Sequence, residues 1–234
     1  MRAALRKGLK NVEVIEMDKP EPLANEVLIA IRSCGICGSD IVRVQDDDEK
    51  WDRIVLGHEF SGDIVAVGED VEGWNVGDRA SAAPLMPCMT CDKCAQGSFS
   101  LCKGYSFIGS RVQGGFGEFL RVPAQNLVAI GSLSYDQAAF IEPITVCLHP
   151  ILRLDNLLGK DVVVTGAGTI GLLAIQIFKA MGCKNIVASD IAPGKLDMAK
   201  SMGANIVCNP IEESLEDVCE RELNDGAHVV FESS

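Results

Sequence analysis

Four closely spaced cysteines are the most distinctive chemical feature of the sequence. They follow the pattern Cys88-x2-Cys91-x2-Cys94-x7-Cys102 in a segment with little regular periodicity. Four thiolates hold Zn²⁺ tetrahedrally in structural sites, and short spacings let one loop wrap around the ion. The alternatives are a redox-active pair, which needs fewer cysteines, and unpaired cysteines in a core. The spacing therefore predicts a structural zinc site in which all coordination positions are filled by protein.

Three further segments each contain a residue type that binds metal. Cys37 lies in CGICGSD, His58 in LGHE and Glu142 in FIEPI. Each motif is weak by itself, because a lone histidine is usually structural and a glutamate near a helix start interacts favourably with the helix dipole. Their joint order around the four-cysteine segment is the stronger signal.

A glycine-rich turn at 166–171 has the sequence context of a dinucleotide-binding loop. It follows an apolar strand expected at 161–165 and precedes a helix expected at 170–181. Gly166 permits a tight turn, Gly168 lets the backbone approach a pyrophosphate, and Gly171 allows close packing of helix on strand. Together with Thr169 and Ile170 they place a helix N-terminus against the phosphates.

A carboxylate follows the next expected strand, at 185–190. Asp190 is in the position where an acidic side chain binds the ribose hydroxyls, and it would repel a 2′-phosphate, so NAD is favoured over NADP. Lys195 lies in the following turn. It either flanks the adenosine or is simply a solvated lysine.

The secondary-structure elements that must position these residues divide the chain into two parts. Up to about residue 130, short runs of β-branched and aliphatic residues (27–31, 63–67, 79–83 and 118–122) predict a β-rich domain, with one brief helix capped by Ser39 and Asp40. A connecting helix is expected over 138–152. Strands and helices then alternate, with further helices at 194–202 and 212–223 and strands at 206–208 and 229–231. This alternation predicts an α/β doubly wound parallel sheet.

Composition and charge limit the classes of partner. The chain has 234 residues, 33 acidic and 21 basic side chains, and a net charge of −12, which argues against nucleic acid or an anionic membrane. No apolar run is long enough to span a membrane, and the first ten residues lack the apolar core of a signal peptide. Clustered cysteines without a secretion signal suggest a cytoplasmic metalloprotein.

The motifs together resemble those of the zinc-dependent medium-chain dehydrogenase family, in its polyol dehydrogenase branch. The resemblance rests on LGHEFSG at 56–62, PLMPC at 84–88, FIGSR at 107–111, GGF at 114–116 and FIEPITV at 140–146. It implies a GroES-like, zinc-binding catalytic domain over residues 1–140. An incomplete Rossmann domain that binds NAD is implied over residues 141–234.

The resemblance also implies roles for individual residues. Cys37, His58 and Glu142 match the catalytic zinc ligands, Glu59 matches an acidic residue beside the metal, and Ser39 matches the hydroxyl that receives the substrate proton. Two zinc ions per chain and NAD are then expected. Many relatives carry a histidine shortly after the Ser-Asp pair, which this chain replaces with Ile41, Val42 and Arg43.

For substrate, the resemblance implies a polyol or polyol phosphate, with galactitol 1-phosphate as the first expectation. Sorbitol-like polyols and threonine-type secondary alcohols remain open. Arg111 is a candidate phosphate contact because guanidinium binds phosphate in bidentate fashion, although a surface arginine is the alternative. A homo-oligomer is expected from the family.

Relatives are expected to continue for about 110 residues beyond Ser234, completing the nucleotide-binding sheet. Two hypotheses follow. The chain is an NAD-dependent polyol dehydrogenase seen without its C-terminal third or as one half of a split enzyme, or it is a zinc-binding remnant without catalytic activity.

Overall fold

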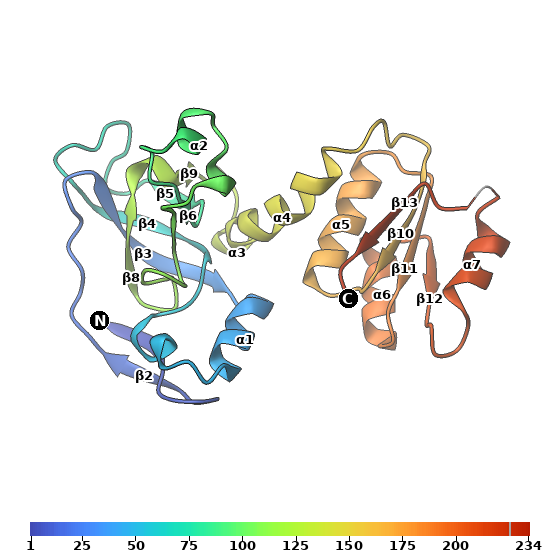
Figure 1. Cartoon of the computed structure of the whole chain (residues 1–234), viewed down its shortest axis with the longest axis horizontal. Coiled ribbons are helices and arrows are strands. Elements are labelled where there is room, and N and C mark those ends of the chain that lie inside the picture. The colour runs from blue at the N-terminus through green and yellow to red at the C-terminus, as the bar shows by residue number, and fades with distance from the viewer. Residues whose placement is uncertain (225) are drawn as a thin grey trace. The chain divides into compact units, whose positions relative to one another are not determined.

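Short strands of β-branched and aliphatic residues build the first of two units, Met1–Glu142, in the computed structural model (Figure 1). The structure describes residues 1–224 and 226–234. The strands of this unit are β1 (Arg2–Arg6), β2 (Val12–Glu16), β3 (Glu26–Gly35), β4 (Glu59–Val67), β5 (Arg79–Ala82), β6 (Leu85–Met86), β7 (Ser106–Phe107), β8 (Phe119–Pro123) and β9 (Leu127–Ala129).

A five-stranded antiparallel sheet in the order β8-β3-β4-β5-β9 forms the centre of this unit. The pairs β1-β2 and β6-β7 form two-stranded sheets. Val27, Ile29 and Ile64 are fully buried in the core of the central sheet, because alternate side chains of a strand point to the same face. The helices are α1 (Gly38–Gln45), α2 (Asp92–Ala95) and α3 (Tyr135–Ala139), with 3₁₀ turns η1 (Glu49–Arg53), η2 (Phe99–Leu101) and η3 (Ala124–Asn126).

The second unit, Pro143–Ser234, is a parallel α/β sheet. Its four strands lie in the order β12-β11-β10-β13, so the chain builds outward from β10 and then crosses to the other side with β13. The elements are β10 (Asp161–Thr165), α5 (Thr169–Ala180), β11 (Asn185–Ser189), α6 (Pro193–Met202), β12 (Ile206–Cys208), α7 (Leu215–Glu222) and β13 (Val229–Glu232), preceded by α4 (Ile141–Ile151).

Helices cover both faces of this sheet. Val162 and Val164 of β10 pack into one cluster with Phe178 of α5, whereas Val163 between them packs with Val218 of α7 on the opposite face. A strand that alternates in this way needs apolar residues at every position, which explains the continuous valine run of β10. The predicted fold class, an α/β chain with a β-rich domain and a doubly wound sheet, is confirmed.

Three elements differ from the sequence-based expectation. The connecting helix is broken at Phe140 into α3 and α4. Helix α7 starts at Leu215 because the Ser214 side chain accepts a hydrogen bond from the Asp217 N–H and caps the helix there. Helix α1 has Cys37 rather than Ser39 as its N-cap residue, and Asp40 takes part in the cap as expected, by accepting the Cys37 backbone N–H at 3.1 Å. No helix within the described residues is long and apolar enough to cross a membrane.

Candidate metal centres and nucleotide-binding loop

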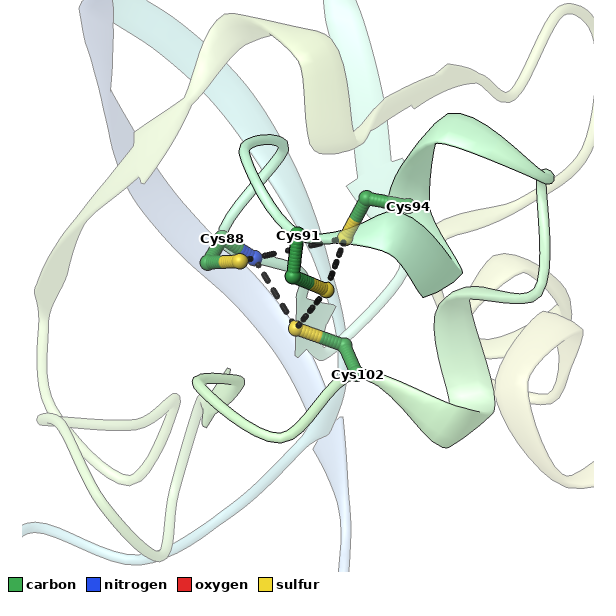
Figure 2. Close-up of side chains that lie close together, drawn as sticks. All are labelled: Cys88, Cys91, Cys94 and Cys102. Carbon is green, nitrogen blue, oxygen red and sulfur yellow. Dashed lines mark hydrogen bonds between the residues drawn. The ribbon is translucent and has the colours of Figure 1, made fainter.

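The four cysteines of the 88–102 segment converge with their sulfurs close together (Figure 2). The Sγ–Sγ distances are 3.6 Å for Cys91–Cys94 and 3.9 Å for both Cys88–Cys94 and Cys91–Cys102. All four are free thiols. Sulfurs bound tetrahedrally to zinc at 2.3 Å lie about 3.8 Å apart, so the observed spacing fits a four-thiolate zinc site.

The surroundings of Cys88, in the 88–102 segment, favour the thiolate form of this cysteine. The Thr90 hydroxyl lies 3.5 Å from Cys88 Sγ, and this contact together with backbone N–H groups lowers the pKa of the Cys88 thiol to about 6. The backbone N–H of Cys88 in turn points at Cys102 Sγ, 3.3 Å away. Because zinc binds the deprotonated form, such donors prepare the loop for the ion.

A second group of metal-binding atoms forms where β3, α1 and β4 meet. Ligand atoms of Cys37, His58 and Glu59 all lie within 4.8 Å of one another. Cys37 is the N-cap of α1, His58 immediately precedes β4, and Glu59 is the first residue of β4. One thiol, one imidazole and one carboxylate are a donor set that zinc accepts, and three protein ligands leave a position for a substrate oxygen.

Glycine at position 35 makes room for this group. Gly35 is paired with Glu59 across β3 and β4, and a Cβ on Gly35 would lie 2.3 Å from Glu59 Oε2. The carboxylate therefore rests directly against the bare backbone of β3. On the other side of the imidazole, the Phe107 ring contacts His58 edge-on with centroids 5.7 Å apart.

The Asp40 carboxylate connects the parts of this site. It is 2% exposed, its Oδ2 accepts the Cys37 N–H, and its Oδ1 lies 3.5 Å from Nδ1 of His58. Nδ1 is buried and has no hydrogen-bond partner within the described residues, and 3.5 Å is too long for a well-formed hydrogen bond to Asp40. Burial lowers the pKa of His58, but Asp40, Glu142 and Glu59 raise it by more.

Glu142 lies in the first turn of α4, outside the group of atoms within 4.8 Å found among the described residues. Its carboxylate nevertheless interacts electrostatically with His58, Glu59 and Asp40, and burial raises its pKa. Burial likewise raises the pKa of Glu59. Buried acids around one imidazole are unfavourable without a compensating charge, and a divalent cation supplies it; the residues therefore fit a zinc ion.

Ser39 and Arg111 are the two remaining residues expected to act on the substrate, and they make different contacts. The Ser39 hydroxyl accepts a hydrogen bond from Arg43 Nη1 at 2.8 Å. Arg111 is exposed, stacks on the Tyr105 ring at 3.9 Å and donates to the Tyr105 carbonyl at 2.8 Å. Its backbone N–H bonds to the carbonyl of Phe107, which is the residue that contacts His58.

The three glycines of the 166–171 loop have different surroundings. Gly166 has φ +80°, in the left-handed region, and a Cβ on Gly171 would lie 1.9 Å from the Gly166 carbonyl oxygen. Gly168 is the N-cap of α5 and has open space around its Cα. The N-terminus of α5, which begins with Thr169 and Ile170, thus has open space beside Gly168.

Asp190 follows β11 and is already engaged by the loop. Its Oδ2 accepts the Ala167 N–H and its Oδ1 accepts the Ala192 N–H, both at 2.9 Å, while Lys195 Nζ lies 3.3 Å from Oδ2. Burial raises the pKa of Asp190, but these donors lower it by more, so the net shift is downward. The carboxylate thus stays ionised and ties the glycine loop to the end of the second strand.

Sequence reasoning did not single out Asp40 as a partner of His58 or Arg43 as a partner of Ser39. A signal for both was present, because Cys37 and Asp40 have capping-box spacing and Ser39 and Arg43 are four residues apart on one helix face. Glu59 was expected beside the metal from the family resemblance, and the pairing of β3 with β4 brings it close to Cys37.

Two family models match the chain. The alcohol dehydrogenase GroES-like domain matches residues 23–132, and the zinc-binding dehydrogenase model matches residues 169–234. Galactitol 1-phosphate 5-dehydrogenase of Escherichia coli K12 is 46% identical over 191 residues, which is 81% of this chain and 55% of that protein. The chain therefore spans about half the length of this curated relative.

Solved structures agree with these matches. The crystal structure of galactitol-1-phosphate dehydrogenase from Escherichia coli has a TM-score of 0.92 and 40% identity, covering 100% of this chain and 68% of that one. An alcohol dehydrogenase from Escherichia coli CFT073 in complex with NADH has a TM-score of 0.91 and 30% identity, covering 100% and 69%. Zinc and NAD are the cofactors that these matches support. As its motifs predicted, the chain belongs to the zinc-dependent medium-chain dehydrogenase family.

Proposed function

We propose that this chain carries the metal site and the nucleotide-binding loop of a dehydrogenase that transfers hydride from a secondary alcohol of a polyol or polyol phosphate to NAD. The observation that carries the proposal is the grouping of Cys37, His58 and Glu59 within 4.8 Å, beside the buried Asp40 and the half-buried Glu142. The similarity to galactitol 1-phosphate 5-dehydrogenase makes galactitol 1-phosphate the first substrate to test. The family match does not favour the non-catalytic alternative.

Cys37, His58 and Glu59 would hold the catalytic zinc, with Glu142 as an additional carboxylate close by. Zinc supplies Lewis acidity, which lets an alcohol lose its proton near neutral pH. Asp40 holds the backbone at Cys37 through a hydrogen bond and lies beside the imidazole of His58, which supports the position of the donor atoms. The Ser39 hydroxyl would receive the substrate proton and at the same time release its own proton to water or to another acceptor, because Arg43 is a donor to Ser39 and no histidine follows in this segment.

The second unit would hold the cofactor. The N-terminus of α5 and the backbone at Gly168 bind the pyrophosphate, and Asp190 binds the adenosine ribose. Because Asp190 is ionised and held by the loop itself, a 2′-phosphate at this position would meet a charge of the same sign. NAD is therefore the expected nucleotide, with Lys195 flanking the site.

The test combines metal analysis with turnover. We expect two zinc ions per chain and formation of NADH, followed by absorbance, with galactitol 1-phosphate; galactitol, sorbitol and L-threonine serve as competing substrates. Cys37→Ser is expected to lose one of the two zinc ions together with the activity. Two bound zinc ions without NADH from any of these alcohols would contradict the proposed function, and absence of zinc would contradict both it and the alternative.

A further inference from the structure

Arg43 lies one helical turn after Ser39 on α1 and contacts the residues around the candidate catalytic metal site. Its Nη1 donates to Ser39 Oγ at 2.8 Å and to Asp40 Oδ1 at 3.2 Å. The side chain is 20% exposed. The chain has a net charge of −12, yet the Arg43 guanidinium directly contacts the Ser39 hydroxyl, which is proposed to receive the substrate proton.

Only part of the guanidinium is used by these contacts. Within the described residues, each hydrogen bond that Arg43 donates comes from Nη1, so Nε and Nη2 have no protein acceptor. The Trp51 ring lies 5.5 Å from Cζ and holds the guanidinium from a second side, and Trp51 is itself anchored by donating to Asp46 at 3.2 Å. The result is a fixed guanidinium with a free edge of donors.

A free guanidinium edge matches the geometry of phosphate. Arginine presents its N–H groups as a planar fork that binds two oxygens at once, and a fork already held in place loses less side-chain entropy on binding. Arg43 Nη1 lies 2.8 Å from Ser39 Oγ, so the free edge of the same guanidinium lies only a few Å farther from that hydroxyl, within the span of a six-carbon chain. A polyol whose alcohol meets Ser39 can thus bring a terminal phosphate to Arg43.

Two other cations of this region, Lys50 and Arg111, are occupied elsewhere. Lys50 also lies over Trp51, at 4.5 Å, but its ammonium group pairs with Asp48. Arg111 stacks on Tyr105 and donates to the Tyr105 carbonyl. Neither has a hydrogen bond or ion pair with Ser39 or Asp40 among the described residues, whereas Arg43 bonds to both.

We propose that Arg43 is a specificity-determining residue that binds the phosphate of a phosphorylated polyol through Nε and Nη2. This inference rests on the proposed function, because it takes the alcohol to lie between the zinc site and Ser39. It deepens that function by assigning the substrate class: polyol monophosphates over free polyols.

Binding by the zinc-loaded chain tests the inference independently of turnover. Titration calorimetry would compare galactitol 1-phosphate with galactitol for the wild-type chain and for Arg43→Met, Arg43→Lys and Arg53→Met. Arg53 is an exposed arginine at the end of η1 and serves as the charge-matched control. We expect Arg43→Met to weaken binding of galactitol 1-phosphate about 10- to 100-fold, the loss typical of charge-assisted hydrogen bonds, with galactitol affinity changed less than about 3-fold. Arg43→Lys should recover part of the lost affinity for galactitol 1-phosphate. Arg53→Met should bind galactitol 1-phosphate as tightly as the wild-type chain does.

Several outcomes overturn the inference. Equal weakening of both ligands by Arg43→Met would show that Arg43 acts only through the structure of α1, and no weakening would show that another group binds the phosphate. A wild-type chain that does not prefer galactitol 1-phosphate over galactitol also overturns it. Phosphate preference that depends on Arg43, without NADH formation, would support the inference while the proposed function fails; NADH formation without phosphate preference would do the reverse.

Discussion

Replacing Gly35 with alanine should selectively damage the candidate catalytic metal site. The new Cβ would lie 2.3 Å from Glu59 Oε2, and contacts under 3.0 Å are not tolerated, so this oxygen must withdraw by about 0.7 Å or more. A displacement of that size is a third of a zinc–oxygen bond of about 2.1 Å. Because the clash is with the end of a flexible side chain, the strand pair β3-β4 should survive.

We therefore expect Gly35→Ala to fold and to keep the zinc of the four-cysteine lobe. Affinity for the second zinc should fall about 10- to 100-fold, as is typical when the support of a metal ligand is disturbed. The assay is competition with a metallochromic chelator, with zinc per chain measured before and after, and circular dichroism to verify folding.

Gly38→Ala is the matched control, because a Cβ there meets nothing within 4 Å and the residue is the first of α1. It should bind both zinc ions with wild-type affinity. The reasoning is refuted if Gly35→Ala retains the second zinc as tightly as Gly38→Ala. It is also refuted if Gly35→Ala loses both metal ions while remaining folded, because the steric effect would then not be local.

Three further predictions concern other parts of the molecule. Cys102→Ser should bind one zinc fewer per chain and lose several kcal/mol of stability, because zinc affinity contributes to folding; metal analysis and thermal unfolding measure both. Asp190→Ala should weaken NAD binding about 10-fold and reduce discrimination against NADP, which nucleotide titration would detect; unchanged discrimination would refute the ribose role. Burial raises the pKa of Asp63, but hydrogen bonds from Tyr135 and Arg32 lower it further than burial raises it. This carboxylate therefore stabilises the fold above its ordinary pKa and loses that contribution as the pH falls through the lower, folded value; Tyr135→Phe should cost about 1 kcal/mol in urea unfolding at neutral pH and progressively less in acid.

Sites whose residues lie close together in the sequence could be predicted from the sequence alone. The spacing of Cys88, Cys91, Cys94 and Cys102 predicted convergent thiols, because a loop of a few residues cannot separate them widely. The glycine turn at 166–171 was readable for the same reason, since strand, turn and helix are contiguous. The alternation of strands and helices after residue 135 predicted the parallel sheet, which is confirmed.

Chemistry that depends on strand pairing was decided only by the tertiary structure. The family resemblance suggested Cys37, His58 and Glu142 as ligands with Glu59 beside the metal. In the fold the ligand atoms of Cys37, His58 and Glu59 lie within 4.8 Å of one another, because β3 and β4 pair so that Glu59 rests on Gly35. The free edge of Arg43 likewise appears only when Trp51, from a separate turn, packs against it. Local spacing thus determined which atoms this protein offers to metal and nucleotide, and long-range packing decided which of them meet, because a one-residue change in strand register moves every side chain to the other face.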